Sequence, residues 1–331
     1  MTGPGPARER VRAEGAPPVG PVAPEAPPND LSVDELRVRP GEDGRVRVDP
    51  GRAQWRYLSV EAGRFGRSPF ALGRAGHEVG VVVIGGGGAL VEGPDGERID
   101  LEARRSPFES LPSAVYLPTS DGWSVTPQPT DGATTVNLAI AWAPRSGRME
   151  VAGGPLVIRP DEVAVETRGA GNMSRQVNHI LDPDSPADRL ILVEVLTPAG
   201  NWSSWPPHKH DVDAMPTEAV LEEVYLYGFR RPEAWGVQRL YRRPEHAPGG
   251  PRDGVWAVGD GELVIVPDGY HPFVAIAGDD AYYLNALAGD RRTLACSFDP
   301  DLDFIRAEWA SMPSDPRLPM VAGERTVGSA F

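Results

Sequence analysis

The sequence predicts an all-β protein made of two similar halves. Short apolar runs rich in Val, Ile, Tyr and Trp recur about every ten residues, and Gly, Pro, Asp and Asn separate them. This texture begins at Leu31 and repeats after Gly153-Gly154-Pro155, which favours two β-barrels of one kind. Helical periodicity is confined to a stretch from Asp303 to Ala310.

The two halves account for most of the chain, with a tail at each end. Residues 1–29 are rich in Pro, Gly and Ala and are expected to form a disordered tail. Residues 30–152 are expected to form a barrel without a metal site, because His77 is its only histidine. Residues 153–310 are expected to form a barrel that holds the active site, and residues 311–331 a C-terminal extension. Strands are expected at 55–60, 78–84, 89–91, 114–117 and 135–142, and then at 156–159, 163–167, 190–196, 223–227, 237–241, 255–257, 262–266, 273–276 and 281–286.

Gly85-Gly86-Gly87-Gly88 lies between two of these strands. It lacks the Lys-Ser/Thr pair and the following helix of a phosphate-binding loop. Glycines at this place supply the positive φ of a hairpin turn.

Composition limits the partners and the compartment. The 33 Lys and Arg against 47 Asp and Glu give a net charge of -14, which argues against nucleic acid and anionic membranes as partners. Cys296 is the only cysteine, so a reducing compartment is favoured. No apolar run approaches the roughly 18 residues of a membrane span, and the first residues lack the apolar core of a secretory signal. We expect a cytoplasmic protein.

The segment Pro206-Pro207-His208-Lys209-His210-Asp211 contains a candidate metal motif. If it is a strand, His208 and His210 share one face and Lys209 points away from them, so Lys209 is not expected to act as the base. Imidazole is a good ligand for divalent first-row metals. The pair alone is weak evidence.

Two later segments offer further ligands. His271 follows the turn Pro267-Asp268-Gly269, and a carboxylate lies at the start of strand 221–227. Alternation places Glu223 with Tyr225 on one face and Glu222 on the other; a polar inner face would favour Glu223, and Glu218 stays a fallback. Three imidazoles and one carboxylate leave open coordination positions, as in catalytic metal sites.

Other polar residues have plainer expectations. His179 and His246 are expected to be surface or hydrogen-bonding groups. Arg168, Arg175 and Arg239 could each bind a carboxylate in bidentate fashion.

Several blocks of the chain resemble the 5-deoxy-glucuronate isomerases of bacterial myo-inositol catabolism, over roughly residues 31 to 310. The blocks are GNMSRQVNHIL at 171–181, NWSSWPPHKHD at 201–211, LEEVY at 221–225, VPDGYHP at 266–272 and YYLN at 282–285. The resemblance implies two cupin barrels and a similarity to 5-keto-4-deoxyuronate isomerases, which bind zinc through three histidines and a glutamate. By motif these ligands fall on His208, His210, Glu223 and His271. The Pro-rich tail and the long interval from His210 to Glu223 depart from a general cupin motif.

The implied reaction converts 5-deoxy-glucuronate, an aldose, into 2-deoxy-5-keto-gluconate, a ketose. A divalent metal would act as a Lewis acid, with zinc favoured and manganese, iron or nickel also suitable. An enediol route and a hydride shift both remain open. Arg175, which lies in one of these blocks, is expected to bind the substrate carboxylate, with Arg239 and Tyr283 as further substrate-binding residues. Tyr225, Tyr241 and Glu222 are the base or proton-relay candidates.

Three alternatives remain beside this interpretation. One is a keto-deoxyuronate isomerase with the same fold and metal. Another is a non-catalytic cupin that binds a sugar acid. A cupin dioxygenase is disfavoured by the blocks around the histidines. Edge strands and apolar surface also favour a homo-oligomer.

Overall fold

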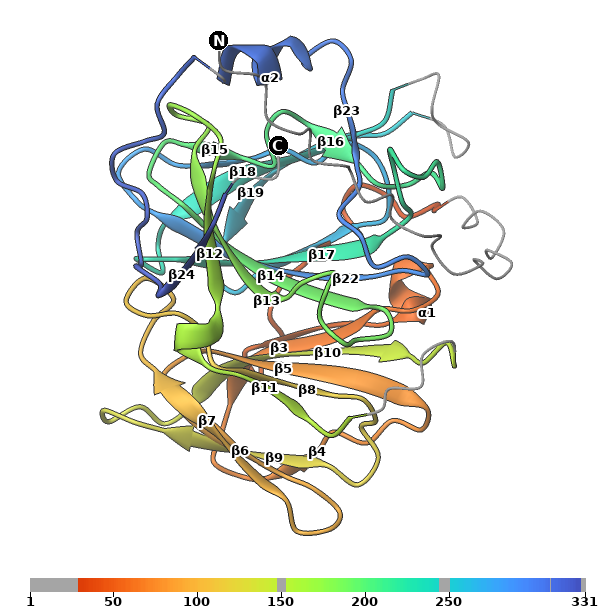
Figure 1. The fold of residues 1–331 in the computed structure, drawn as a ribbon, viewed down its shortest axis with the longest axis vertical. Coiled ribbons are helices and arrows are strands. Elements are labelled where there is room, and N and C mark those ends of the chain that lie inside the picture. Colours follow the sequence, from red (N-terminus) through yellow and green to blue (C-terminus); the bar gives the residue numbers. More distant parts are fainter. Residues whose placement is uncertain (1–28, 148–152, 244–250, 310, 329–331) are drawn as a thin grey trace, which may run out of the picture.

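The computed structural model describes residues 29–147, 153–243, 251–309 and 311–328. These residues form two β-barrels, drawn from orange to yellow-green and from green to blue in Figure 1. In the described part the α-helices are short, namely α1 (Pro50–Ala53) and α2 (Phe304–Trp309), so the all-β prediction is confirmed. No helix of the described residues could span a membrane. The predicted tail up to residue 28 and His246 lie outside the described residues.

The first barrel combines a six-stranded and a four-stranded sheet, with strand orders β11-β8-β5-β10-β3-β2 and β4-β9-β6-β7. Alternation fills its interior: Val79, Val81 and Val83 of β5 point inward, while Val82 points to the other barrel. Gly86 links β5 to β6 with a positive φ of 81°, but these strands belong to different sheets and do not pair, so the hairpin predicted at 85–88 is corrected to a link between the two sheets. The strands are β2 (Arg45–Val48), β3 (Ser59–Phe65), β4 (Phe70–Ala71), β5 (His77–Gly85), β6 (Gly87–Glu92), β7 (Arg98–Arg104), β8 (Ala114–Leu117), β9 (Ser124–Pro129), β10 (Val136–Pro144) and β11 (Leu156–Ile158).

The second barrel is built on an eight-stranded sheet of order β1-β20-β17-β22-β14-β13-β12-β24. A four-stranded sheet, β15-β21-β18-β19, and the pair β16-β23 complete it. Its strands are β1 (Arg37–Val38), β12 (Ala164–Arg168), β13 (Arg175–Leu181), β14 (Leu190–Thr197), β15 (Trp202–Ser203), β16 (His208–Lys209), β17 (Glu222–Phe229), β18 (Trp235–Tyr241), β19 (Asp253–Gly259), β20 (Leu263–Val266), β21 (Phe273–Ala275), β22 (Ala281–Ala288), β23 (Ser297–Phe298) and β24 (Arg325–Val327).

The large sheets of the two barrels pack face to face in the middle of the molecule (Figure 1). The contact is close at Gly80, where a Cβ would lie 2.5 Å from Leu192 Cδ1. A buried ion pair crosses it, with Arg104 Nη2 donating to Glu194 Oε1 at 2.7 Å. Because one face of the eight-stranded sheet is covered in this way, its other face is left to line the interior of the second barrel.

Short strands cross the predicted boundaries between the halves. Strand β1 pairs with β20 of the second barrel, β11 pairs with β8 of the first, and β24 pairs in parallel with β12. The sheets therefore do not end at the boundaries predicted at residues 29, 152 and 310. The division into domains at these residues stays a prediction.

Candidate active site

A cavity of about 80 Å³ opens inside the second barrel. The inner faces of β13, β14, β17 and β22 form its wall, and residues from loops and from helix α2 complete the lining. Its lining consists of Arg168, Arg175, Val177, Val193, Val195, Ser204, Trp205, His208, His210, Leu221, Glu223, Tyr225, Tyr283, Asn285, Leu287, Leu294, Cys296, Phe298 and Trp309.

Three buried side chains converge beside this cavity. Nε2 of His210 lies 2.7 Å from Glu223 Oε2, and Nε2 of His271 lies 3.4 Å from the same oxygen. The three donor atoms lie within 4.8 Å of one another, and no other such group of His, Cys, Asp and Glu occurs in the described residues. His77 of the first barrel is instead half-buried at the start of β5, with Nδ1 2.9 Å from the Ala75 carbonyl.

Hydrogen bonds fix which nitrogen of each ring faces the glutamate. His271 Nδ1 lies 2.9 Å from the Gly269 carbonyl, and His210 Nδ1 lies 3.0 Å from the Leu221 carbonyl. A carbonyl only accepts, so each Nδ1 carries a proton and each Nε2 of a neutral ring presents a lone pair to Glu223. Lone pairs and a carboxylate oxygen require a cation between them, either a proton or a metal ion.

The electrostatics of the group favour a cation between the two rings and the carboxylate. Burial lowers the pKa of His271 to about 4, so this ring is neutral near pH 7, and its buried Nε2 has no hydrogen-bond partner in the described structure. Burial also opposes the charge of His210, but the Glu223 carboxylate outweighs it and raises the pKa of that ring. Two imidazoles and one carboxylate are compatible with a divalent metal.

His208 lies beside this group rather than within it. It is half-buried on the two-residue strand β16, and its ring centroid is 4.7 Å from that of His271 and 6.4 Å from that of His210. Burial and the two neighbouring rings lower the pKa of His208 well below its ordinary value. The ring is therefore neutral and close enough to add a third imidazole.

Arg175 brings a positive charge into the cavity. Its Nη1 donates to the carbonyls of Met173 and Trp205, each at 3.2 Å, and its guanidinium lies 5.6 Å from the Trp309 ring centroid. Burial lowers the pKa of Arg175 to about 10, which still leaves it charged at neutral pH. Its charge is available to an anion, because carbonyl acceptors do not neutralise it.

Arg168 also lines the cavity, but Glu166 pairs with it. Two hydrogen bonds of 2.8 and 2.6 Å join the guanidinium to that carboxylate, which also contacts His179 at 3.0 Å. His179 is thus a hydrogen-bonding group, as expected.

Two tyrosines stand near the histidines on inward-facing strand positions. The Tyr225 hydroxyl lies 2.7 Å from Ser204 Oγ, and its ring lies 5.7 Å from His271 and 4.7 Å from Tyr283. Burial and then the charge of Glu223 raise the pKa of Tyr225 well above its ordinary value. Ser204 has φ of 49°, which is uncommon for a residue other than glycine and often marks a functional turn.

Three predicted site residues lie elsewhere, and the expectation that they line the site is corrected. Glu222 points to the opposite face of β17 and accepts three backbone hydrogen bonds from the first barrel. The Tyr241 hydroxyl donates to Asp299 Oδ2 at 2.5 Å, and exposed Arg239 pairs with Asp253 at 2.8 Å. Both line a separate apolar groove with Val255.

Glu218, the fallback ligand, is also occupied away from the histidines. Its carboxylate accepts from Lys209 Nζ at 2.8 Å and from the backbone of Asp211 and Val212.

Several lining residues were not predicted. Ser204 and Trp205 were quoted only as part of a motif, and Asn285 shares the face of Tyr283 by the alternation of β22. Leu294, Cys296, Phe298 and Trp309 come from the segment after β22, where the sequence has no strand periodicity that would indicate their direction.

The amino-acid sequence is similar to those of known proteins. Residues 34–305 match the model of the KduI/IolB family. A Geobacillus kaustophilus protein named 5-deoxy-glucuronate isomerase is 37% identical over 268 residues, which cover 80% of this chain and 92% of that one. A protein of the same name from Bacillus subtilis is 33% identical over 62% of this chain and 72% of its own length.

Solved structures agree on the architecture. The crystal structure of an IolB-like protein from Salmonella typhimurium has a TM-score of 0.73 at 34% identity, covering 82% of this chain and 99% of that one. The oxalate decarboxylase of Lactobacillus farciminis, at 9% identity and a TM-score of 0.50, shares the fold alone. The cupin fold predicted from the sequence is confirmed.

Proposed function

Because the chain belongs to the KduI/IolB family, we propose that it is an aldose–ketose isomerase that converts 5-deoxy-glucuronate into 2-deoxy-5-keto-gluconate. The relatives that carry the name of this activity at 36 and 37% identity, each over 80% of the chain, support the assignment. The observation that carries it is the Glu223 carboxylate, which faces Nε2 of two buried histidines beside a cavity that holds Arg175.

The proposed metal ligands are His208, His210, Glu223 and His271. Zinc is the metal we propose first, since it prefers imidazole and carboxylate ligands, and manganese, iron and nickel accept the same set. When bound, the metal acts as a Lewis acid on the substrate carbonyl and makes the neighbouring C–H acidic.

Arg175 is proposed to bind the substrate carboxylate. Its fork of donors suits bidentate binding of a carboxylate, and its charge is already buried and held by two carbonyls. Val177, Val193 and Val195 form an apolar part of the cavity wall. Anchored at one end, the sugar acid is directed with its other end toward the histidines.

Tyr225 is proposed as the proton donor. Its raised pKa keeps the hydroxyl protonated at neutral pH, so it can donate to an oxygen that gains negative charge during the reaction. Ser204, hydrogen-bonded to it, can pass the proton on, and Tyr283 packs against it. This role serves both an enediol route and a hydride shift.

A substrate panel tests the reaction. The purified protein is given 5-deoxy-glucuronate and, separately, 5-keto-4-deoxyuronate, and the products are followed by NMR. We expect formation of the ketose from the first substrate at a rate well above that with the second. Preferential turnover of the second would replace the proposed substrate, and binding of both without turnover would indicate a sugar-acid-binding protein.

Two expectations about the context accompany the proposal. A cytoplasmic location fits the single cysteine and the acidic composition. A homo-oligomer fits the exposed Trp235 and Val255 on the small sheet. Light scattering on the purified protein tests the oligomer.

A further inference from the structure

The proposed ligands come from two separate segments that must be held in register. His208 and His210 lie on the segment at 206–211, whereas His271 follows the turn at 267–269. The side chain of Asp211 joins these two segments. Its Oδ1 accepts from Lys209 Nζ at 2.5 Å, and its Oδ2 accepts from the backbone N–H of Gly269 at 2.8 Å.

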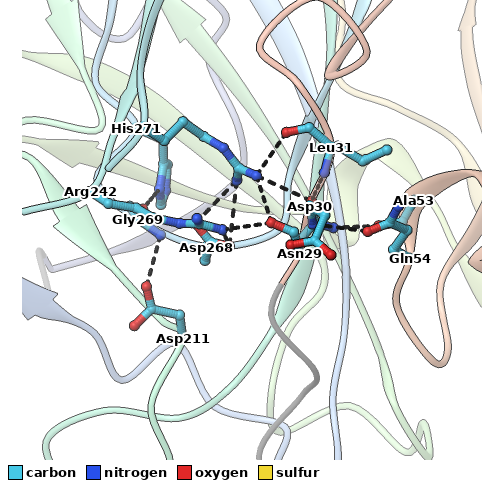
Figure 2. A network of polar contacts seen from close by, with 11 residues as sticks. Asn29, Asp30, Leu31, Ala53, Gln54, Asp211, Arg242, Asp268, Gly269 and His271 are labelled. Carbon is cyan, nitrogen blue, oxygen red and sulfur yellow. Dashed lines mark hydrogen bonds and ion pairs between the residues drawn. The ribbon is translucent and has the colours of Figure 1, made fainter. Parts of the chain in front are cut away.

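Gly269 connects Asp211 directly to a proposed ligand. The Gly269 carbonyl accepts the hydrogen bond of His271 Nδ1, so one peptide unit on each side of this residue is fixed (Figure 2). Gly269 has φ of +82°, and a Cβ there would lie 2.6 Å from the Tyr241 carbonyl. Only glycine fits this conformation of the turn. Asp211, which follows His208 and His210 in the chain, holds the turn through its hydrogen bond to Gly269.

Asp211 is itself held in place. Lys209 donates to both oxygens of Glu218, at 2.8 and 3.0 Å, and Glu218 Oε1 accepts from the backbone of Asp211 and Val212. Because Lys209 and Glu218 are buried, solvent screens their ion pair only weakly. The charge and direction of the Asp211 carboxylate are thus set by its neighbours.

Asp268 holds the same turn from the opposite side. Arg242 pairs with both of its oxygens, and Arg252 Nη1 lies 3.3 Å from Oδ1. These arginines also donate to the carbonyls of Asn29 and Leu31, at 2.9 to 3.1 Å (Figure 2). The segment of Asn29 and Leu31, at least 240 residues earlier in the chain, is in this way part of the support of His271.

We propose that Asp211 and Asp268 are positioning residues that fix His271 relative to His208 and His210 and so set the affinity of the site for a divalent metal. This inference rests on the proposed metal binding. The two carboxylates act through the Asp268–Gly269 turn and do not touch the metal or the substrate. Loss of such outer partners typically weakens metal affinity about 10- to 100-fold.

The test measures zinc affinity of the metal-free full-length protein by competition with a chelating dye. Asp211→Ala is expected to weaken zinc binding by about 10- to 100-fold, and Asp268→Ala by a similar factor. Asp211→Asn keeps an acceptor for the Gly269 N–H and should recover part of the loss. Asp213→Ala, on the same loop, removes an exposed partner of Arg291 and serves as the matched control. Asp253→Ala, which removes the exposed partner of Arg239, is the control for Asp268.

The outcomes separate this inference from the proposed function. If the wild type binds zinc and both Asp211→Ala and Asp268→Ala bind it equally tightly, the positioning role is overturned. The proposed metal isomerase is unaffected by that outcome. Failure of the wild type to bind zinc would overturn both. If Asp211→Ala does not fold, Asp268→Ala decides: weaker zinc binding at an unchanged melting temperature supports the role, and wild-type affinity contradicts it.

Discussion

The carboxylates of Glu222 and Glu223 serve opposite faces of strand β17. Glu223 faces His210 and His271 inside the second barrel, whereas Glu222 accepts backbone hydrogen bonds from Arg56, Tyr57 and Leu58 of the first barrel. The strand that supplies a proposed metal ligand is therefore anchored to the neighbouring barrel by the adjacent residue. One residue contributes to the site and the other to the interface.

Replacing Glu222 should lower the stability of the fold and should not directly affect turnover. Glu222→Ala leaves three N–H groups at the barrel interface without their acceptor, so we expect the free energy of unfolding to fall by about 2–4 kcal/mol. Denaturant titration measures this change, with exposed Glu233→Ala as a control. A folded Glu222→Ala protein with wild-type stability but greatly reduced turnover would restore Glu222 as a catalytic candidate.

Arg175→Met should raise KM more than it lowers kcat. The variant removes a hydrogen-bonded charge from the substrate carboxylate, which is worth about 1.5–3 kcal/mol, or about 10- to 100-fold in KM. Steady-state kinetics measures the effect. Arg239→Met removes an exposed arginine that pairs with Asp253 outside the cavity, and it should leave KM unchanged. The reverse pattern would assign the carboxylate to Arg239.

Tyr225→Phe should lower kcat while the metal content stays at the wild-type level. A positioned proton donor contributes about 10²- to 10⁴-fold, and the variant removes only the hydroxyl that contacts Ser204. Tyr227→Phe is the matched control, because its hydroxyl contacts Gln238 and does not line the cavity. Equal kcat for Tyr225→Phe and the wild type would exclude this hydroxyl from the proton transfer.

Cys296 should react slowly with thiol reagents at pH 8. Burial raises the pKa of its thiol to about 11, so the reactive thiolate is scarce at pH 8 and increases as the pH rises toward 11. We expect alkylation by iodoacetamide at pH 8 to be on the order of 100-fold slower than for an ordinary thiol, with a roughly tenfold increase per pH unit. Mass spectrometry follows the single adduct. A rate that levels off below pH 9 would contradict the raised pKa.

Local periodicity was enough to predict the all-β fold class and the opposite directions of the residues along β17. The spacing of apolar runs indicated the strands, and alternation along β17 separated Glu223 and Tyr225 from Glu222. The turn before His271 was also readable from Pro267-Asp268-Gly269. The proposed roles of these residues stay predictions until they are measured.

Pairing and loop direction could not be predicted from local pattern. Arg37 and Val38 pair with β20, a partner more than 200 residues away, and no short-range signal specifies that register. Tyr241 and Arg239 were misplaced because strand β18 belongs to the small sheet, where they line a separate groove. Trp309 reaches the cavity from helix α2, whose docking depends on tertiary contacts.

The measurement that tests the central claim most directly is turnover of 5-deoxy-glucuronate before and after chelation, with metal content determined on the same samples. We expect about one divalent metal ion per chain, ketose formation that stops on chelation and returns with added zinc, and loss of both metal and turnover in His271→Ala. Full activity of a protein stripped of metal, or of His271→Ala, would contradict the account.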